Sequence, residues 1–245
     1  MSIYLHGDIH GEARDLSYLK QLNLTREDYV IILGDFGMIW DQEETKNEKY
    51  WLNYLQNRSW TTLFLDGNHE NFTRLNAYPI DEWNGGKVQY IRQNIIHLMR
   101  GQVYNIDGMT FFTMGGASSH DIRDGVLQPD DPRIKTWRYR FDKFFRIDGI
   151  SWWKEELPSK EEYAEGWKNL EKVNFKVDFI LSHSPSTSEL ILLGNGSYEK
   201  DDLTDYLDDV FATVDYKRHY FGHMHINRMI NRKSICLYNN IERIS

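Results

Sequence analysis

The chain has 245 residues, 40% of them hydrophobic and 14% aromatic, and a formal net charge of −8, so it can bury one sizeable core and is not a disordered chain. The negative charge opposes loose adhesion to nucleic acid or anionic lipid, and no apolar run reaches the roughly 18 residues of a membrane span. A single cysteine, Cys236, excludes an internal disulfide, and no secretory signal precedes the first predicted strand, so we expect a cytoplasmic protein.

The first half of the chain alternates apolar runs with helical patterns. Residues 2–6, 29–33 and 61–65 predict buried strands, and residues 13–22 and 43–57 predict helices between them. This order indicates βαβ units around a parallel sheet. Functional residues of such sheets gather beyond the carboxyl ends of the strands, and each of these strands ends in a glycine-containing cluster.

The second half predicts more closely spaced strands. They fall at 95–98, 103–106, 110–114, 177–181 and 219–221, and Asp107-Gly108 predicts a tight turn between the second and third. Residues 201–212 predict a helix, and 228–231 with 234–238 predict a closing hairpin. We therefore expect an α/β fold with two packed sheets and helices outside, in a single domain spanning residues 1–245.

Residues 118–172 predict an insertion, or cap, between strands. Its run 133–146 holds six basic residues and one acidic residue, which reverses the charge of the rest of the chain. Aromatic residues alternate there with Arg138 and Arg140. One interpretation is a substrate cap in which Arg138 and Arg140 bind phosphate and the aromatics stack on a ring. The other is an amphipathic element docked on the core or on a second copy of the chain.

Five short clusters carry the residue types that divalent metal ions bind. They lie at 7–11, 34–37, 67–70, 182–185 and 222–225, and their candidate ligands are Asp8, His10, Asp35, Asn68, His183, His223 and His225. Carboxylate, imidazole and amide oxygen together suit hard-to-intermediate ions. Seven ligands, one of them bridging, can supply two ions with about four each. Singly, an aspartate here could instead cap a helix, and a histidine could be an ordinary core residue.

In order and spacing, the five clusters resemble the calcineurin-like metallophosphoesterases over residues 7–225. Gly115-Gly116-Ala117 together with Trp152-Trp153 looks like a pattern found in the small bacterial and phage members of that family. The resemblance implies a two-sheet αββα sandwich that holds two divalent ions. The first ion would bind Asp8, His10, Asp35 and His225, and the second would bind Asp35, Asn68, His183 and His223. A metal-bridging hydroxide would attack a phosphomonoester or phosphodiester, and His69 would protonate the leaving group or hold the phosphate.

One departure from the family pattern concerns the partner of His69. In the protein phosphatase branch, the second cluster continues to an Asp that orients the acid histidine, followed by an Arg-Gly pair. Here Met38 follows the cluster, which disfavours the protein or peptide phosphatase alternative and leaves Asp41 and Asp66 as candidate partners of His69. The other alternative is a metal-bound binding scaffold without turnover.

The ligand set also limits which metal ions and which substrates are expected. Oxygen and nitrogen ligands suit Mn, which we expect, with Fe, Zn or Ni as alternatives. We expect a small phosphorylated substrate, for which a nucleotide is one candidate, and neither a membrane partner nor a stable nucleic-acid complex. His120 lies in a loop that could overhang the site and is a further candidate substrate contact. The oligomeric state is left open.

Overall fold

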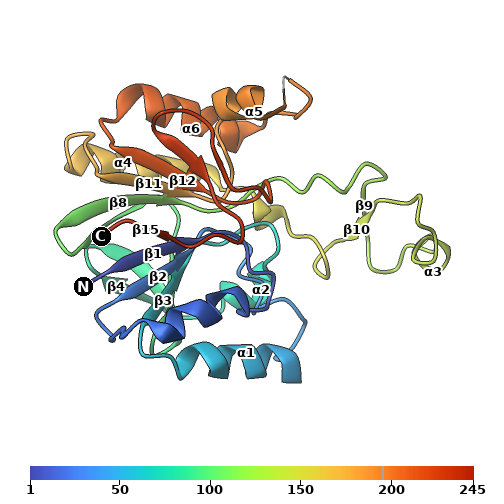
Figure 1. Cartoon of the computed structure of the whole chain (residues 1–245). Coiled ribbons are helices and arrows are strands. Elements are labelled where there is room, and N and C mark those ends of the chain that lie inside the picture. The colour runs from blue at the N-terminus through green and yellow to red at the C-terminus, as the bar shows by residue number, and fades with distance from the viewer. Residues whose placement is uncertain (195) are drawn as a thin grey trace.

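Two β-sheets packed face to face form the centre of the protein, and helices cover both outer faces (Figure 1). One sheet has seven strands and the other has six, so the predicted two-sheet αββα sandwich is confirmed. The computed structural model describes residues 1–194 and 196–245. No helix within those ranges has both the length and the apolar character needed to cross a bilayer.

The seven-stranded sheet contains the three strands predicted in the first half of the chain. In sheet order it consists of β15 (Glu242–Arg243), β1 (Ile3–His6), β2 (Tyr29–Ile32), β3 (Thr61–Phe64), β6 (Ile95–Leu98), β5 (Gly86–Arg92) and β4 (Ile80–Trp83). Strands β1, β2, β3 and β6 are parallel, so their carboxyl ends share one edge. The sequence does not predict β4, because this edge strand is largely exposed and lacks an apolar face.

The six-stranded sheet comes mainly from the second half of the chain. In sheet order it consists of β13 (Arg228–Met229), β14 (Ser234–Cys236), β12 (Arg218–Phe221), β11 (Phe179–Ser182), β8 (Met109–Met114) and β7 (Gln102–Ile106). Strands β14, β12, β11 and β8 are parallel. The predicted turn between β7 and β8 is present, with Asp107 and Gly108 at φ 54° and 75°, the left-handed pair that a two-residue hairpin requires.

The helices divide between the two outer faces. On the seven-stranded sheet lie η1 (Asp15–Gln21), α1 (Lys46–Gln56) and α2 (Phe72–Leu75), and on the other side lie α4 (Lys160–Lys172), α5 (Thr187–Gly194) and α6 (Asp202–Thr213). The helix predicted at 13–22 is a 3₁₀-helix. Its buried residues, Leu16 and Leu19, are three apart, which is the spacing at which a 3₁₀-helix aligns side chains on one face.

Successive side chains of the central strands point to opposite faces of the sheet and therefore pack in different layers of the core. In β1, Ile3 and Leu5 pack between the sheets with Leu181 of β11, whereas Tyr4 packs under the helices with Leu52 of α1. A third layer lies between the six-stranded sheet, α4 and α6. A one-residue slip of β1 would exchange these faces, so burial specifies the register that places each strand end.

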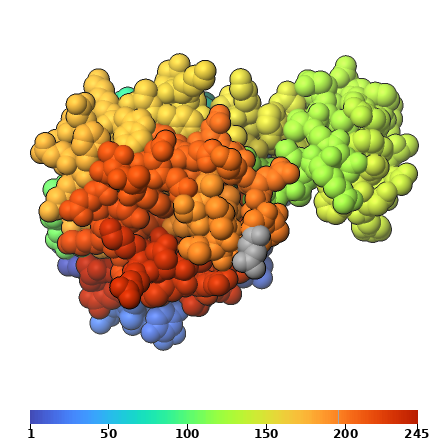
Figure 2. Space-filling model, turned by 90° about the horizontal axis from the view of Figure 1, so that it is seen from above, coloured from blue at the N-terminus to red at the C-terminus, as the bar shows by residue number. Residues whose placement is uncertain are grey.

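Residues 121–150, here called the arm, project from the sandwich as a separate lobe (Figures 1 and 2). The arm contains a small parallel sheet of β9 (Val126–Leu127) and β10 (Arg146–Ile147), with α3 (Ile134–Trp137) at its far end. Tyr139 and Phe141 are 78% and 102% exposed, so the aromatic run is not docked on the core. Beyond the arm, η2 (Lys154–Glu156) leads to α4, which packs on the six-stranded sheet.

Candidate metal centre

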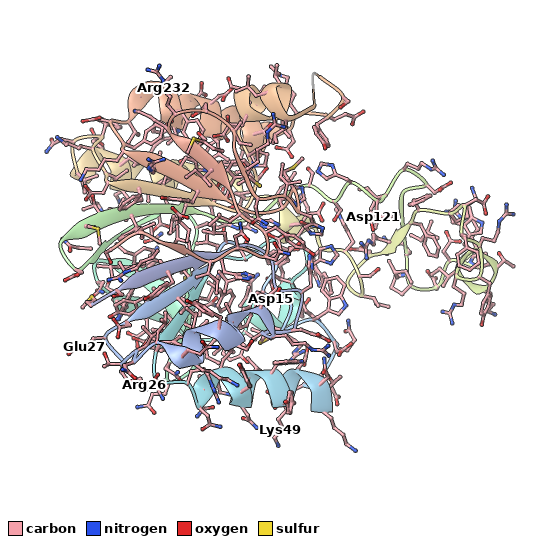
Figure 3. All side chains as sticks on the ribbon, in the orientation of Figure 1. Asp15, Arg26, Glu27, Lys49, Asp121 and Arg232 are labelled. Carbon is pink, nitrogen blue, oxygen red and sulfur yellow. The ribbon has the colours of Figure 1, made fainter. Side chains whose placement is uncertain are left out.

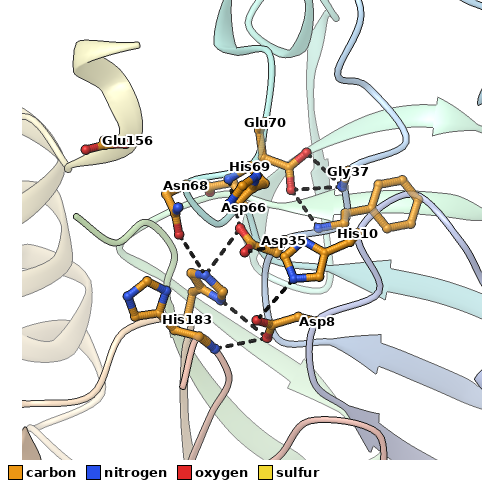
Figure 4. Close-up of polar contacts among 12 residues, drawn as sticks. Asp8, His10, Asp35, Gly37, Asp66, Asn68, His69, Glu70, Glu156 and His183 are labelled. Atoms are coloured by element: carbon orange, nitrogen blue, oxygen red, sulfur yellow. Dashed lines mark hydrogen bonds and ion pairs between the residues drawn. The ribbon is translucent and has the colours of Figure 1, made fainter. Parts of the chain in front are cut away.

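The carboxyl ends of strands from both sheets meet at one edge of the sandwich, where the candidate ligands lie (Figure 4). Asp8, Asp35 and Asn68 follow β1, β2 and β3, while His183 and His223 follow β11 and β12. Two of the cluster glycines allow this convergence. A Cβ on Gly67 would overlap Oδ1 of Asp35, and one on Gly222 would overlap Oδ1 of Asp8.

Four of the seven candidate ligands have left-handed backbone conformations. His10, Asp35, His223 and His225 have φ values of 43°, 45°, 63° and 50°. Such conformations are uncommon for residues other than glycine and store of order 1–3 kcal/mol each. They persist only where the surrounding structure imposes them, and here they turn side chains from separate strand ends toward one point.

The first group of candidate ligands is Asp8, His10, Asp35 and His225. Their ligand atoms all lie within 4.8 Å of one another. Nε2 of His10 and Nε2 of His225 are 2.9 Å apart. Oδ2 of Asp8 is buried and accepts no hydrogen bond within the described chain, although Nε2 of His225 lies 3.1 Å from it. A cation would satisfy the unpaired oxygen and both nitrogens, so this donor set fits a divalent ion.

The second group is Asp35, Asn68, His183 and His223. Nδ1 of His183 lies 2.8 Å from the carbonyl oxygen of Leu33, to which it can donate. Its Nε2 lies 3.3 Å from Oδ1 of Asp35 and 3.3 Å from Oδ1 of Asn68. The rings of His183 and His223 are 5.0 Å apart. In the neutral ring that donates through Nδ1, the Nε2 lone pair faces two oxygens, and a bound cation would remove that repulsion.

The pKa shifts of His183, Asp35 and His223 also indicate that a positive charge is favourable between the two aspartates. Burial by itself would lower the pKa of His183, but the carboxylates of Asp35 and Asp8 raise it to about 9. Burial would raise the pKa of Asp35, but the charge of His183, with His69 and His10, holds it far below its usual range. Burial and the charge of His183 lower the pKa of His223. A proton on His183 and a metal ion are thus alternative sources of the missing charge.

Asp35 lies between the two groups. Its Oδ2 is 3.8 Å from Nδ1 of His10 in the first group, and its Oδ1 is 3.3 Å from Nε2 of His183 in the second. Oδ1 also accepts a 2.8 Å hydrogen bond from the backbone N–H of His69. Asp35 therefore presents one carboxylate oxygen to a histidine of each group.

His69 is half-buried against an aromatic wall beside the first group. Its ring centroid is 5.1 Å from that of His10 and 5.4 Å from that of Trp40, which packs on Trp153. Burial lowers the pKa of His69, and the charge of Asp35 opposes that shift. The His69 ring makes no side-chain hydrogen bond to the described part of the chain.

Within the described residues, neither candidate partner of His69 forms a hydrogen bond or ion pair with its ring. Asp66 is buried and accepts hydrogen bonds from Arg100, at 2.7 Å from Nε, and from His97, at 3.0 Å. The Asp41 side chain is exposed and forms no hydrogen bond or ion pair within the described residues; its backbone N–H and carbonyl oxygen are both hydrogen-bonded elsewhere. Met38, at the position that disfavours a protein phosphatase, is fully buried in the core.

The structure brings one of the three predicted substrate contacts to the centre. His120 is exposed, and its Nε2 lies 2.8 Å from Nε2 of His223. Arg138 and Arg140 instead lie toward the far end of the arm, and Arg140 pairs with Asp142 at 2.7 Å. Within the described residues, no contact links either arginine to the centre. Their role as substrate contacts remains a prediction.

Several residues beside the centre were not singled out from the sequence. A cavity of about 700 Å³ next to His120 is lined in part by Arg123, Tyr198 and Lys200. Asp121, near the arm's junction with the sandwich in Figure 3, forms an ion pair with Arg146. The charge of Arg146 contributes to the lowered pKa of His69. The basic run 133–146 contains Arg146, but no periodicity distinguishes it from the arginines at the far end.

Two further residues, one on each side of the arm in sequence, form a series of hydrogen bonds with Asn68. Nδ2 of Asn68 donates to Oγ of Ser119 at 3.3 Å, and Oγ of Ser119 donates to Oε2 of Glu156 at 2.6 Å. Ser119 and Glu156 are 37 positions apart. The only sequence signals near them, Gly115-Gly116-Ala117 and Trp152-Trp153, do not indicate that they meet.

Three comparisons relate this chain to known proteins. A Caenorhabditis elegans protein designated UPF0046 is 23% identical over 225 residues, covering 89% of this chain and 50% of that protein, so the chain spans about half of this relative. A Staphylococcus aureus structure described as a “Putative 5′-Nucleotidase” in complex with α-ketoglutarate overlaps 99% of this chain and 50% of its own, with 13% identity and a TM-score of 0.44. The family model of calcineurin-like phosphoesterases matches residues 1–227. This chain therefore belongs to the calcineurin-like phosphoesterase family.

Proposed function

We propose that this protein hydrolyses phosphomonoesters or phosphodiesters of small molecules at a centre for two divalent ions, with Mn as the expected metal. The observation that carries the proposal is the position of Asp35, whose two oxygens face His10 in one ligand group and His183 in the other. Family membership supports a metal-dependent hydrolase of phosphate esters.

The chain's own residues have separate roles in this proposal. When bound, two divalent ions supply a nucleophilic water near neutral pH and offset the charge that develops on phosphate. Asp35 and the other members of the two ligand groups would hold the ions. His69, outside both groups, delivers a proton to the leaving oxygen or donates a hydrogen bond to the phosphate.

The surroundings of the centre support a small polar substrate. The cavity of about 700 Å³ beside His120 is within the usual size range of small-ligand pockets, and its lining is polar, with the cations Arg123 and Lys200 beside the acids Glu156, Glu199 and Asp201. The burial of Met38, with no charged group in its place, further disfavours the protein phosphatase alternative.

Metal binding and turnover can be tested together with an Asp35→Asn variant. We expect about two equivalents of Mn per wild-type chain by elemental analysis, and hydrolysis of at least one monoester, diester or nucleotide in a panel that includes a phosphopeptide. Asp35→Asn should reduce both metal content and turnover, because a neutral amide cannot bridge two cations. Asp107→Asn is the matched control, since Asn tolerates the left-handed turn conformation of that residue.

The outcomes separate the alternatives. Metal-free wild-type protein that cannot be loaded with Mn, Fe, Zn or Ni would refute the metal centre. Two bound ions without turnover of any substrate would favour a binding scaffold. Turnover confined to the phosphopeptide would favour a protein phosphatase.

A further inference from the structure

We propose that Ser119 and Glu156 are positioning residues that hold the amide of Asn68 with its oxygen facing the second ligand group. The inference rests on the proposed two-metal function. The hydrogen bonds run in one direction, from Nδ2 of Asn68 to Oγ of Ser119 and from Oγ of Ser119 to Oε2 of Glu156. On the opposite side of the amide, Oδ1 of Asn68 lies 3.3 Å from Nε2 of His183.

The direction of these hydrogen bonds follows from the donors and acceptors present. An ionised carboxylate only accepts, so Glu156 requires the hydroxyl hydrogen of Ser119 to point toward it. The Ser119 oxygen then presents a lone pair to Asn68, which selects the NH₂ end of the amide. The last torsion of an Asn side chain is soft, and the opposite orientation would direct two N–H donors at the ions.

The series of hydrogen bonds from Asn68 through Ser119 to Glu156, here called the relay, is buried, and further hydrogen bonds fix Glu156 at its end. Asn68, Ser119 and Glu156 are 7%, 9% and 4% exposed, so most of their surface is shielded from water, and Ser119 and Glu156 border the cavity beside His120. The backbone N–H of Ser119 also donates to Oε1 of Glu156 at 3.1 Å. The carbonyl oxygen of Glu156 accepts the N–H of Ala117 at 3.0 Å. Both carboxylate oxygens are therefore used, and the side chain has little freedom to turn away.

Ser119 and Glu156 also flank the arm in sequence, so the same contacts could serve only to close the base of the arm. A purely structural role predicts loss of stability without selective loss of metal binding. A positioning role predicts weaker binding of one ion out of two, because Asn68 belongs to the second group alone. Residues that orient metal ligands in this way typically change metal affinity by about 10–100-fold when removed.

The test measures Mn²⁺ binding to metal-free full-length protein by calorimetric titration, with the thermal midpoint of each variant alongside. Ser119→Ala should weaken one of the two binding steps by about 10–100-fold and leave the other unchanged. Glu156→Gln, which replaces one acceptor oxygen with a donor, should weaken the same step. Ser118→Ala is the matched control, because Ser118 donates to Asp201 at 2.6 Å in an equivalent serine–carboxylate pair next in the chain. It should bind both ions as the wild type does.

Three results would overturn the inference, and each is distinct. If Ser119→Ala and Glu156→Gln bind both ions with wild-type affinity while Asn68→Ala loses one, the relay does not position Asn68. If both relay variants lose the two ions equally and their thermal midpoints fall together, the role is structural. If the wild type itself binds fewer than two ions, the two-metal function fails first.

Discussion

His69→Ala should reduce turnover sharply while leaving the ligand groups intact. The ring makes no side-chain hydrogen bond within the described structure, and its contact with Asp35 uses the backbone N–H, which alanine retains. The ring is half-buried, packed on His10 and Trp40, so we expect less than about 1 kcal/mol of lost stability. Metal content should stay near that of the wild type.

The size of the effect depends on the leaving group if His69 supplies a proton. A positioned acid contributes about 10²–10⁴-fold, equivalent to about 2.7–5.4 kcal/mol of barrier, when the leaving oxygen is a poor leaving group. An alkyl phosphate should therefore lose about that much turnover in the variant. A p-nitrophenyl phosphate, whose leaving group departs without a proton, should lose much less.

The assay compares kcat for these two substrates with wild type, His69→Ala and His69→Gln, after metal content has been matched. His69→Gln keeps a hydrogen-bond donor but cannot transfer a proton, so it should resemble His69→Ala on the alkyl substrate. Equal losses on both substrates would refute the acid role and assign His69 to holding phosphate. Unchanged kcat on both would remove His69 from the chemistry altogether.

Three other predictions concern the supports of the centre. Gly67→Ala should lower metal content, measured by elemental analysis, because its Cβ would overlap Oδ1 of Asp35; wild-type content would contradict this crowding. Arg100→Met leaves buried Asp66 without its cation and should lower the free energy of unfolding in urea by about 3–5 kcal/mol; a change below about 1 kcal/mol would contradict it. Burial would raise the pKa of Glu189, but the charge of His219 holds that pKa below its ordinary value of 4.5. The ionised Glu189 therefore contributes its full stabilisation above pH 4.5, and this stabilisation is lost as the pH falls through the lower pKa of the folded state. In Glu189→Gln the free energy of unfolding should fall less steeply as the pH is lowered, and the same pH dependence as the wild type would refute this.

Local patterns were sufficient for the central strands and for several turns. Apolar runs ending in Gly-Asp or Gly-Asn predict β1, β2 and β3 within a residue or two, because a buried strand and the polar turn after it differ sharply in composition. Asp107-Gly108 predicts its hairpin because few residues adopt the left-handed conformations that the turn needs. Elements without such contrast, such as the exposed strand β4, are missed.

The ligand residue types could be identified from the sequence, but their arrangement could not be derived from local pattern alone. Their order and spacing resemble a family, and that family is confirmed. The distances that place Asp35 between His10 and His183 arise only when the two sheets pack and their strand ends meet. The left-handed conformations of four candidate ligands likewise depend on that packing, since nothing local favours them.

The surroundings of the centre were decided by tertiary structure. The pattern of the basic run 133–146 predicts Arg138 and Arg140 as substrate contacts, yet both lie toward the far end of the arm. Arg146, at the end of the same run, is close enough for its charge to lower the pKa of His69. Local periodicity records which face of an element is apolar, but not where a projecting segment returns to the core. The sequence by itself therefore determined the residue types and strand ends of the centre. Packing of the two sheets decided which side chains meet there, and the return of the arm placed Glu156 against Ser119.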